Sequence, residues 1–131
     1  MTDHAPKLLK EIELFSELND QDLKEVATLA QVKKLPTDST IFHEGDDADA
    51  VFVVVNGRVK IVTTSTDGKE FILTVLGAGQ VFGEMGLLET APRSASVVTI
   101  TDVELLVIKR ADFDHLLTSS PGISRKLMAI L

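Results

Sequence analysis

Cysteine is missing from this sequence of 131 residues. The chain therefore cannot form a disulfide framework, a cysteine-ligated metal site, an iron–sulfur cluster or a thiol nucleophile. A reducing cytoplasm is the simplest compartment for such a chain, and we expect it there. The length and a hydrophobic content of 44% suit one compact domain with its own core. We predict a single domain over residues 1–131.

Long apolar runs are also missing. The longest unbroken run, Ala50 to Val55, is far too short to span a bilayer. The N-terminal stretch "MTDHAPKLLKEIELF" lacks the basic head and apolar core of a secretion signal. We expect neither a membrane segment nor a targeting peptide.

Basic residues are in the minority. Thirteen lysines and arginines stand against twenty aspartates and glutamates, which gives a formal net charge of −7. This charge repels a polyanionic duplex, so we expect no nucleic-acid binding by this chain alone. A small anion is still allowed, because one well-placed arginine sets the local potential whatever the net charge.

The two ends of the sequence have helical periodicity. Within residues 1–36, Asn19 or Asp20 can cap a helix that Pro36 would follow. Within residues 110–131, Ser120 and Pro121 suit the cap and first position of a second C-terminal helix. The apolar positions that share a helical face are Leu23, Val26, Ala27 and Ala30 in the first part, and Phe113, Leu116, Leu117, Ile123, Leu127, Ile130 and Leu131 in the last.

The middle part, residues 37–109, has the pattern of short strands. The runs "AVFVVV", "RVKIVTT", "EFILTVL" and "SASVVTITDVELLVI" are rich in β-branched and aromatic residues. Asn56-Gly57 and Asp67-Gly68 favour the tight turns of β-hairpins. The prediction is a mainly β fold with flanking α-helices, in which about eight strands form a double-stranded β-helix, a jelly-roll-like β-roll.

The stretch "FGEMGLLETAPRSAS", residues 82–96, concentrates polar chemistry in an otherwise apolar region. Glu84, when ionised, only accepts hydrogen bonds and suits a pair of sugar hydroxyls, whereas Arg93 offers a fork of donors for phosphate oxygens. Gly83 and Gly86 allow close approach to the backbone. Free amides at the start of a helical turn near Met85 would also attract an anion. These residues describe a sugar-phosphate site; the alternative is a solvated ion pair worth about 0–1 kcal/mol.

The same stretch resembles the phosphate-binding cassette of the cyclic nucleotide-binding domain family, which includes bacterial cyclic AMP receptor proteins, kinase regulatory subunits and nucleotide-gated channels. The resemblance extends to "HEGDDADAVFVVVNGRVKIV", to "TDGKEFILTVLGAGQVFGE" and to the helices after Lys109, so it covers nearly the whole chain. It implies a regulatory domain that binds a cyclic nucleotide and is not an enzyme. Cyclic AMP is the expected ligand ahead of cyclic GMP, with no further cofactor.

The resemblance also implies roles for individual residues. Glu84 would accept from the ribose 2′-hydroxyl, and Arg93 would hold the cyclic phosphate. Backbone amides or close approach would come from the cassette residues Gly83, Met85, Gly86, Ser94 and Ala95. Ile61, Leu73 and Phe82 are candidates for the base pocket, and ordinary core packing is the alternative for these three.

The family's lid helix, which closes over the base, is represented here only by its beginning, "PGISRKLMAIL". The base-capping residue is therefore not identifiable. The apolar stripe of this helix suits either packing on the roll or a homodimer, and an effector domain or partner is a further expectation. The rival hypothesis is a ligand-independent interaction module with the same fold.

Metal sites are disfavoured by the sequence. The acidic run "EGDDADA" lacks the ligand order of an EF-hand, and His4, His43 and His115 have no close metal-site spacing. A small phosphodiesterase would need a base or a metal near the phosphate, and the sequence offers neither. We therefore predict no metal and no catalytic residue.

Overall fold

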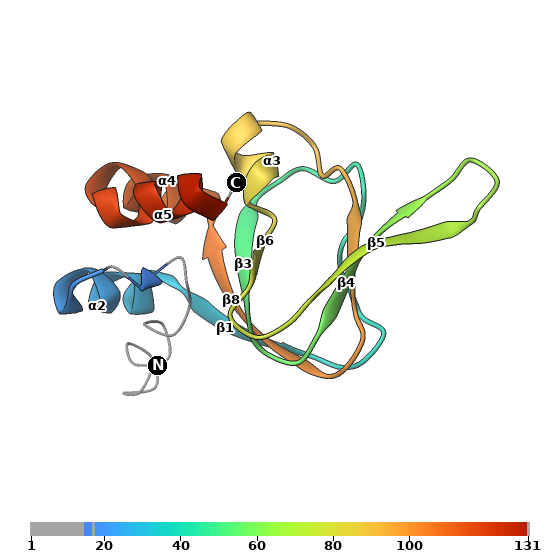
Figure 1. The fold of residues 1–131 in the computed structure, drawn as a ribbon, viewed down its shortest axis with the longest axis horizontal. Coiled ribbons are helices and arrows are strands. Elements are labelled where there is room, and N and C mark those ends of the chain that lie inside the picture. The colour runs from blue at the N-terminus through green and yellow to red at the C-terminus, as the bar shows by residue number, and fades with distance from the viewer. Residues whose placement is uncertain (1–14, 17, 131) are drawn as a thin grey trace.

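The eight strands in the part of the chain that the structure describes form two antiparallel sheets that wrap into a roll (Figure 1). The computed structural model describes residues 15, 16 and 18–130, without the side chains of residues 88, 89 and 127–130. The first sheet has the order β1 (Gln31–Leu35), β8 (Val103–Lys109), β3 (Ala50–Asn56) and β6 (Val81–Phe82). The second has the order β2 (Thr40–Phe42), β7 (Ser96–Thr99), β4 (Val59–Thr64) and β5 (Glu70–Leu76). The predicted β-roll with flanking helices is confirmed.

The apolar run of β3 is explained by burial on both faces. Val51 and Val53 point outward into the core formed with the helices, whereas Phe52 and Val54 point into the roll. Strand β8 is divided in the same way. An alternating pattern would leave one of these faces polar, so the run is continuous because neither face meets water.

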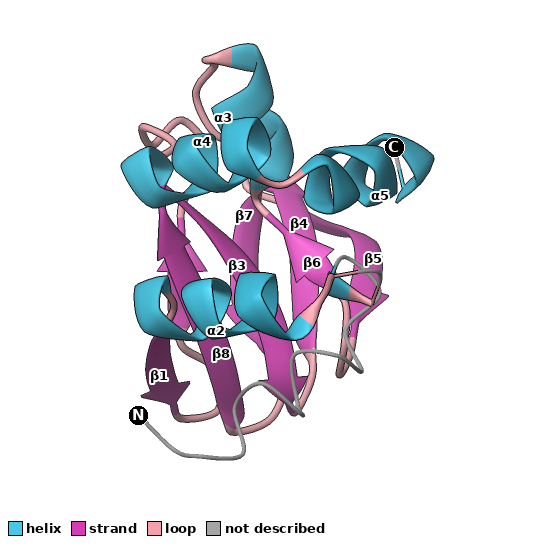
Figure 2. Ribbon diagram, turned by 90° about the vertical axis from the view of Figure 1, so that its left-hand side faces the viewer, coloured by secondary structure: helices cyan, strands magenta, loops and turns pink. Residues whose placement is uncertain are grey.

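The helices cover the outer face of the first sheet, as Figure 2 shows for α2 (Asp20–Leu29) lying across β8 and β3. The predicted cap is confirmed, because Asn19 Oδ1 accepts from the Asp22 amide at 2.8 Å. The predicted apolar face is confirmed as well, with Leu23, Val26 and Ala27 buried.

The C-terminal helices α4 (Arg110–Ser119) and α5 (Pro121–Ile130) join the same core through Phe113, Leu116 and Ile123. Pro121 is the first residue of α5, as predicted. Ser120 caps this helix with its backbone carbonyl, which accepts from the Ile123 amide at 3.2 Å, while its buried hydroxyl has no partner. The side chains of Leu127 and Ile130 and the whole of Leu131 lie outside the described residues.

One predicted boundary is wrong. The sequence pattern places residues 31–35 in the N-terminal helical part, but they form β1, which pairs with β8 from Gln31↔Val107 to Leu35↔Val103. Helix α2 ends at Leu29 because Ala30 is already extended. Pairing with β8 then decides the conformation of a segment whose own pattern is weak. Residues 1–14 of the predicted helical part lie outside the described residues.

The two predicted hairpin turns have different outcomes. Asp67-Gly68 lies in the β4–β5 hairpin, as predicted. Asn56-Gly57 instead carries the chain from one sheet to the other, because β3 and β4 do not pair. Gly57 has φ +93°, and a Cβ there would lie 2.4 Å from the Asp102 carbonyl oxygen, so this corner requires glycine.

Candidate functional site

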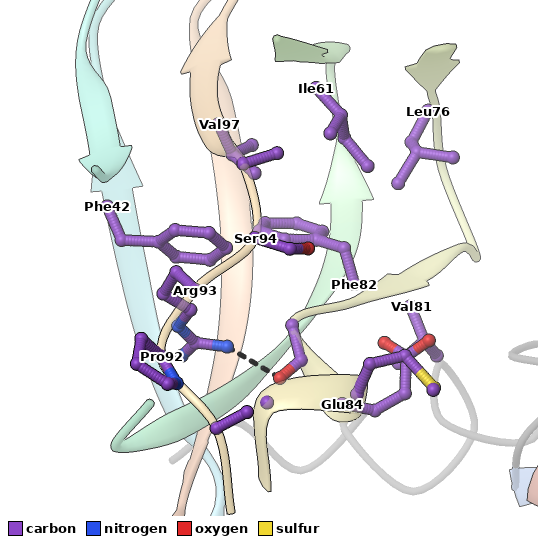
Figure 3. A pocket seen from close by; sticks show the side chains of 15 residues that line it. Phe42, Ile61, Leu76, Val81, Phe82, Glu84, Pro92, Arg93, Ser94 and Val97 are labelled. Carbon is purple, nitrogen blue, oxygen red and sulfur yellow. Dashed lines mark hydrogen bonds between the residues drawn. The ribbon is translucent and has the colours of Figure 1, made fainter. Parts of the chain in front are cut away.

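A pocket of about 440 Å³ opens into the roll beside the short helix α3 (Glu84–Glu89) (Figure 3). This volume lies within the range of small-molecule sites. Apolar side chains from β2, β4, β6 and β7 and the end of β5 line its inner part, and α3 with the following loop supplies its polar groups. The lining residues are Phe42, Ile61, Leu76, Val81, Phe82, Gly83, Glu84, Met85, Gly86, Ala91, Pro92, Arg93, Ser94, Ala95 and Val97.

Arg93 is the charged centre of this pocket although its exposed fraction is only 4%. Its Nη1 donates to the Gly83 carbonyl at 2.6 Å, and its Nη2 donates to the Ala50 carbonyl at 2.6 Å (Figure 3 shows the first of these). Its backbone is fixed as well, since the Arg93 amide donates to the Asp46 carbonyl and the Gly45 amide donates to the Arg93 carbonyl, both at 2.8 Å. The guanidinium is therefore held at the meeting point of three segments.

The positive charge of Arg93 is only partly compensated. Its one ion-pair contact among the described residues joins Nη2 to Asp49 Oδ1 at 3.9 Å, and the Asp49 side chain is 87% exposed, so water screens this pair. Burial lowers the pKa of Arg93, and the nearby charge of Arg110 lowers it further, against the opposing effect of Asp49. The buried Nε has no hydrogen-bond partner. A buried, undercompensated cation with an unused donor fits an anionic ligand.

Glu84 is the first residue of α3 and lies partly buried at the pocket wall. Burial raises the pKa of this carboxyl, and a backbone hydrogen bond and the charge of Arg93 oppose that rise. When ionised, the carboxylate can only accept hydrogen bonds, so it suits hydroxyl donors and not a phosphate. Carboxylate and guanidinium thus provide opposite chemistry within one pocket.

The two cassette glycines have a packing reason of their own. Gly83 has φ +86°, and a Cβ there would lie 2.9 Å from Nη1 of Arg93. A Cβ on Gly86 would lie 2.7 Å from the Cβ of Ala48. Both residues therefore let α3 close around the guanidinium, apart from any approach of a ligand.

Most of the residues predicted for the site come together in this pocket. Glu84, Arg93 and every other predicted cassette residue line it, and so do Ile61 and Phe82. Leu73 does not, which corrects both its assignment to the base pocket and the alternative of core packing. This side chain is 59% exposed, in a strand whose residues 70–75 are all exposed, and it lies at the bulge of the β4–β5 pairing, between the pairs Val62↔Ile72 and Ile61↔Thr74. Leu76, at the end of the same strand, lines the pocket instead.

Sequence reasoning missed Phe42 and the backbone carbonyls that hold Arg93. Phe42 precedes the cassette by 40 residues in the sequence, and no local spacing connects the two. The Ala50 and Gly83 acceptors are main-chain atoms, which any residue type carries. Only the folded chain could identify them.

The acidic run that leads into β3, residues 44–50, supports the site through its backbone. Asp46 accepts from the Arg93 amide through its carbonyl, while its side chain is exposed. Two histidines each lie beside a carboxylate: His43 Nδ1 is 3.8 Å from Asp46 Oδ2, and His115 Nε2 is 2.7 Å from Glu25 Oε1. Within residues 15–16 and 18–130, no group of three or more potential ligands could hold a metal ion, and no helix is long and apolar enough to cross a membrane.

A second arginine connects this site to the C-terminal helices. Arg110, the first residue of α4, donates from Nη2 to the Ala48 carbonyl at 2.6 Å and from Nε to the same oxygen at 3.1 Å. Its Nη1 lies 3.5 Å from the Leu87 carbonyl of α3, and its amide donates to the Asp49 carbonyl at 2.9 Å. The segment before β3, residues 46–49, is therefore held by hydrogen bonds from Arg93 at one end and from Arg110 at the other.

Comparison with known proteins identifies one family. The family model described as "Cyclic nucleotide-binding domain" matches residues 32–120, more than half of the chain. The cyclic AMP receptor protein of Thermus thermophilus is 36% identical over 118 residues, which cover 90% of this chain and 55% of that protein. A cAMP-activated global transcriptional regulator of Haemophilus influenzae is 41% identical over 105 residues, covering 79% and 47%. A cyclic nucleotide-gated potassium channel of Rhizobium etli is 34% identical over 121 residues, covering 92% and 32%.

Solved structures agree with this assignment. The catabolite activator protein of Thermus thermophilus has a TM-score of 0.82 at 35% identity, with 90% of this chain and 55% of that chain covered. The regulatory domain of Toxoplasma gondii PKA, solved with cAMP, has a TM-score of 0.77 at 26% identity, covering 95% and 55%. The chain spans about half the length or less of the curated relatives named above.

The raised pKa of Glu84 predicts a gain of stability in Glu84→Gln. An acid whose pKa is raised by folding contributes stability below its unfolded pKa and loses that contribution as the pH rises through the folded value. The variant should therefore melt at a higher temperature than the parent near neutral pH, and the difference should shrink as the pH falls below about 4.3, the ordinary pKa of glutamate, where the carboxyl becomes protonated in the folded and the unfolded chain. Thermal unfolding followed by circular dichroism between these pH values measures it.

Glu44→Gln is the matched control, because Glu44 is exposed in the loop before β3. Its melting temperature should follow the parent at every pH. Equal melting temperatures for Glu84→Gln and the parent across the whole range would contradict the assigned cost of burying this carboxylate.

Proposed function

The chain belongs to the cyclic nucleotide-binding domain family, and we propose that it is a regulatory domain that binds a cyclic nucleotide without chemical turnover. The observation that carries this proposal is the buried guanidinium of Arg93, with Nε unpaired, in the same pocket as a carboxylate at Glu84. We expect the domain to act in the cytoplasm. We propose the same regulatory role for this domain within any longer protein that contains it.

Arg93 and Glu84 divide the polar part of the ligand between them. Arg93 holds the cyclic phosphate, because its donors match anionic oxygens and its buried charge lacks a close counterion. Glu84 accepts from the ribose 2′-hydroxyl. The cassette backbone at Gly83, Met85 and Gly86, and at Ser94 and Ala95, supplies further amides or close approach along the same wall.

The base lies deeper in the roll, against the apolar side chains of Ile61 and Phe82. Cyclic AMP is the proposed ligand ahead of cyclic GMP, because two of the relatives are named for cyclic AMP. Ser94, next to Arg93, contributes a neutral hydroxyl to the pocket, and this hydroxyl is compatible with either adenine or guanine.

Binding is proposed to reach the flanking helices through the segment before β3. A phosphate that attracts the Arg93 guanidinium alters its hydrogen bond to the Ala50 carbonyl. Two residues earlier, the Ala48 carbonyl accepts a hydrogen bond from Arg110. Arg110 begins α4, so a displacement of this segment moves the start of the C-terminal helices. The ligand shifts this equilibrium only by its differential affinity for the two arrangements.

The ligand prediction is tested by calorimetric titration with cyclic AMP and, separately, cyclic GMP. The parent domain should bind with a single saturable site and favour cyclic AMP. Arg93→Lys should weaken binding about 10- to 100-fold, because the fork of charge-assisted hydrogen bonds is lost while the charge remains. Glu84→Gln should weaken it about tenfold, because the amide is a poorer acceptor for the 2′-hydroxyl.

Glu84→Gln is the decisive variant once thermal unfolding shows that it melts no lower than the parent, because a loss of binding then cannot come from unfolding. Failure of the folded parent to bind either nucleotide would contradict the proposal and favour a ligand-independent interaction module. Unchanged affinity in both variants would contradict the roles given to Arg93 and Glu84.

The coupling through Arg110 is tested by hydrogen exchange of the α4 amides with and without cyclic AMP. The parent should show a ligand-dependent change of exchange rate across Arg110–Ser119, and Arg110→Gln should bind within a few-fold of the parent while losing most of that change. Arg125→Gln, an exposed substitution on α5, is the matched control. A full ligand response in Arg110→Gln would rule out this route.

A further inference from the structure

The aromatic side chain of Phe42 lies against Arg93. The Cζ atom of Arg93 lies over the Phe42 ring, 4.1 Å from its centroid, and 5.8 Å from the centroid of Phe52 (Figure 3 shows Phe42 beside Arg93). Both distances are within the range of cation–π attraction, and the shorter one is close to direct contact. Phe42 therefore presents the negative face of its ring to the charge on which the pocket depends.

This contact matters more than it would at a surface. Arg93 is 4% exposed, and its ion-pair contact at 3.9 Å is to a carboxylate that is 87% exposed. The two carbonyl hydrogen bonds fix Nη1 and Nη2, but Nε has no partner. The face of the Phe42 ring, which carries no net charge, thus offers the guanidinium the negative potential of its π-system. This attraction is strongest where water is excluded.

The Phe42 ring is itself held in place by two other rings. It lies 5.7 Å from Phe52 at an interplanar angle of 40° and 6.1 Å from Phe82 at 42°, while Phe52 and Phe82 stack at 5.1 Å. Tilted contacts at these separations are favourable aromatic arrangements. Strand β2 ends at Phe42, so the second sheet fixes one side of the guanidinium and the first sheet, through Ala50, fixes the other.

We propose that Phe42 is a positioning residue for ligand binding, which holds the Arg93 guanidinium in the orientation that receives the anion. This inference rests on the proposed function, in that the anion is the cyclic phosphate. A weaker ring contact lowers the fraction of molecules with Arg93 in place, and the apparent dissociation constant rises by the same factor.

The test replaces Phe42 with mono-, di- and trifluorophenylalanine in the full chain. Fluorine withdraws electron density from the ring face with little change of shape, so it weakens the cation–π contact while packing is preserved. Cyclic AMP affinity should fall stepwise with each fluorine, by about three- to tenfold at the trifluorinated ring. The same series at Phe113, which is buried but lies in the core with the helices and does not line the pocket, is the matched control and should stay within about twofold.

A second measurement does not depend on any ligand. In the free protein, ¹⁵N relaxation of the Arg93 Nε–H group should show an ordered side chain in the parent and increasing motion along the Phe42 series. This separates the two possible failures. If the parent binds no cyclic nucleotide yet Arg93 loses order on fluorination, the proposed function fails and the positioning role stands. If the parent binds but neither affinity nor Arg93 order changes along the series, Phe42 is only a packing residue and the inference is overturned.

Discussion

The buried guanidinium of Arg93 is the constraint on which the pocket depends. Burying a cation is costly unless hydrogen bonds compensate it, and Arg93, at 4% exposure, donates to two backbone carbonyls, those of Gly83 and Ala50. Those two carbonyls come from the start of the cassette and the start of β3. The residue at 83 must then be glycine, since a Cβ would meet Nη1. The cassette, the segment before β3 and the end of β2 all converge on one side chain.

The double-sided burial of the first sheet places this site next to the helices. The inner face of β3 contributes Phe52 to the aromatic cluster around Arg93, while its outer face packs on α2, α4 and α5. Arg110 continues the connection with hydrogen bonds between α4 and the segment before β3. A β-roll whose wall is shared between a pocket and a helical layer suits the proposed regulatory role, because close-packed residues connect the two faces of that wall.

The sequence predicted those features that depend on local pattern. The cap at Asn19, the helical faces and the hairpin at Asp67-Gly68 followed from periodicity and turn chemistry. The grouping of the cassette residues around one site followed from the family resemblance, and these residues line one pocket. The features it missed depend on pairing between distant segments. Strand β1 forms because β8 lies beside it, and Asn56-Gly57 is a corner between sheets. Leu73 is exposed at a bulge in a strand whose residues 70–75 are all exposed. Phe42 is 51 residues from Arg93 in the chain, so only the closed roll brings its ring to the guanidinium.

The most direct test of the central claim is a crystal structure of the domain with cyclic AMP. The account predicts clear density for the nucleotide in the roll, with its cyclic phosphate hydrogen-bonded to Arg93 and its ribose 2′-hydroxyl on Glu84. A nucleotide bound outside this pocket, or one in the pocket with its phosphate turned away from Arg93, would contradict it.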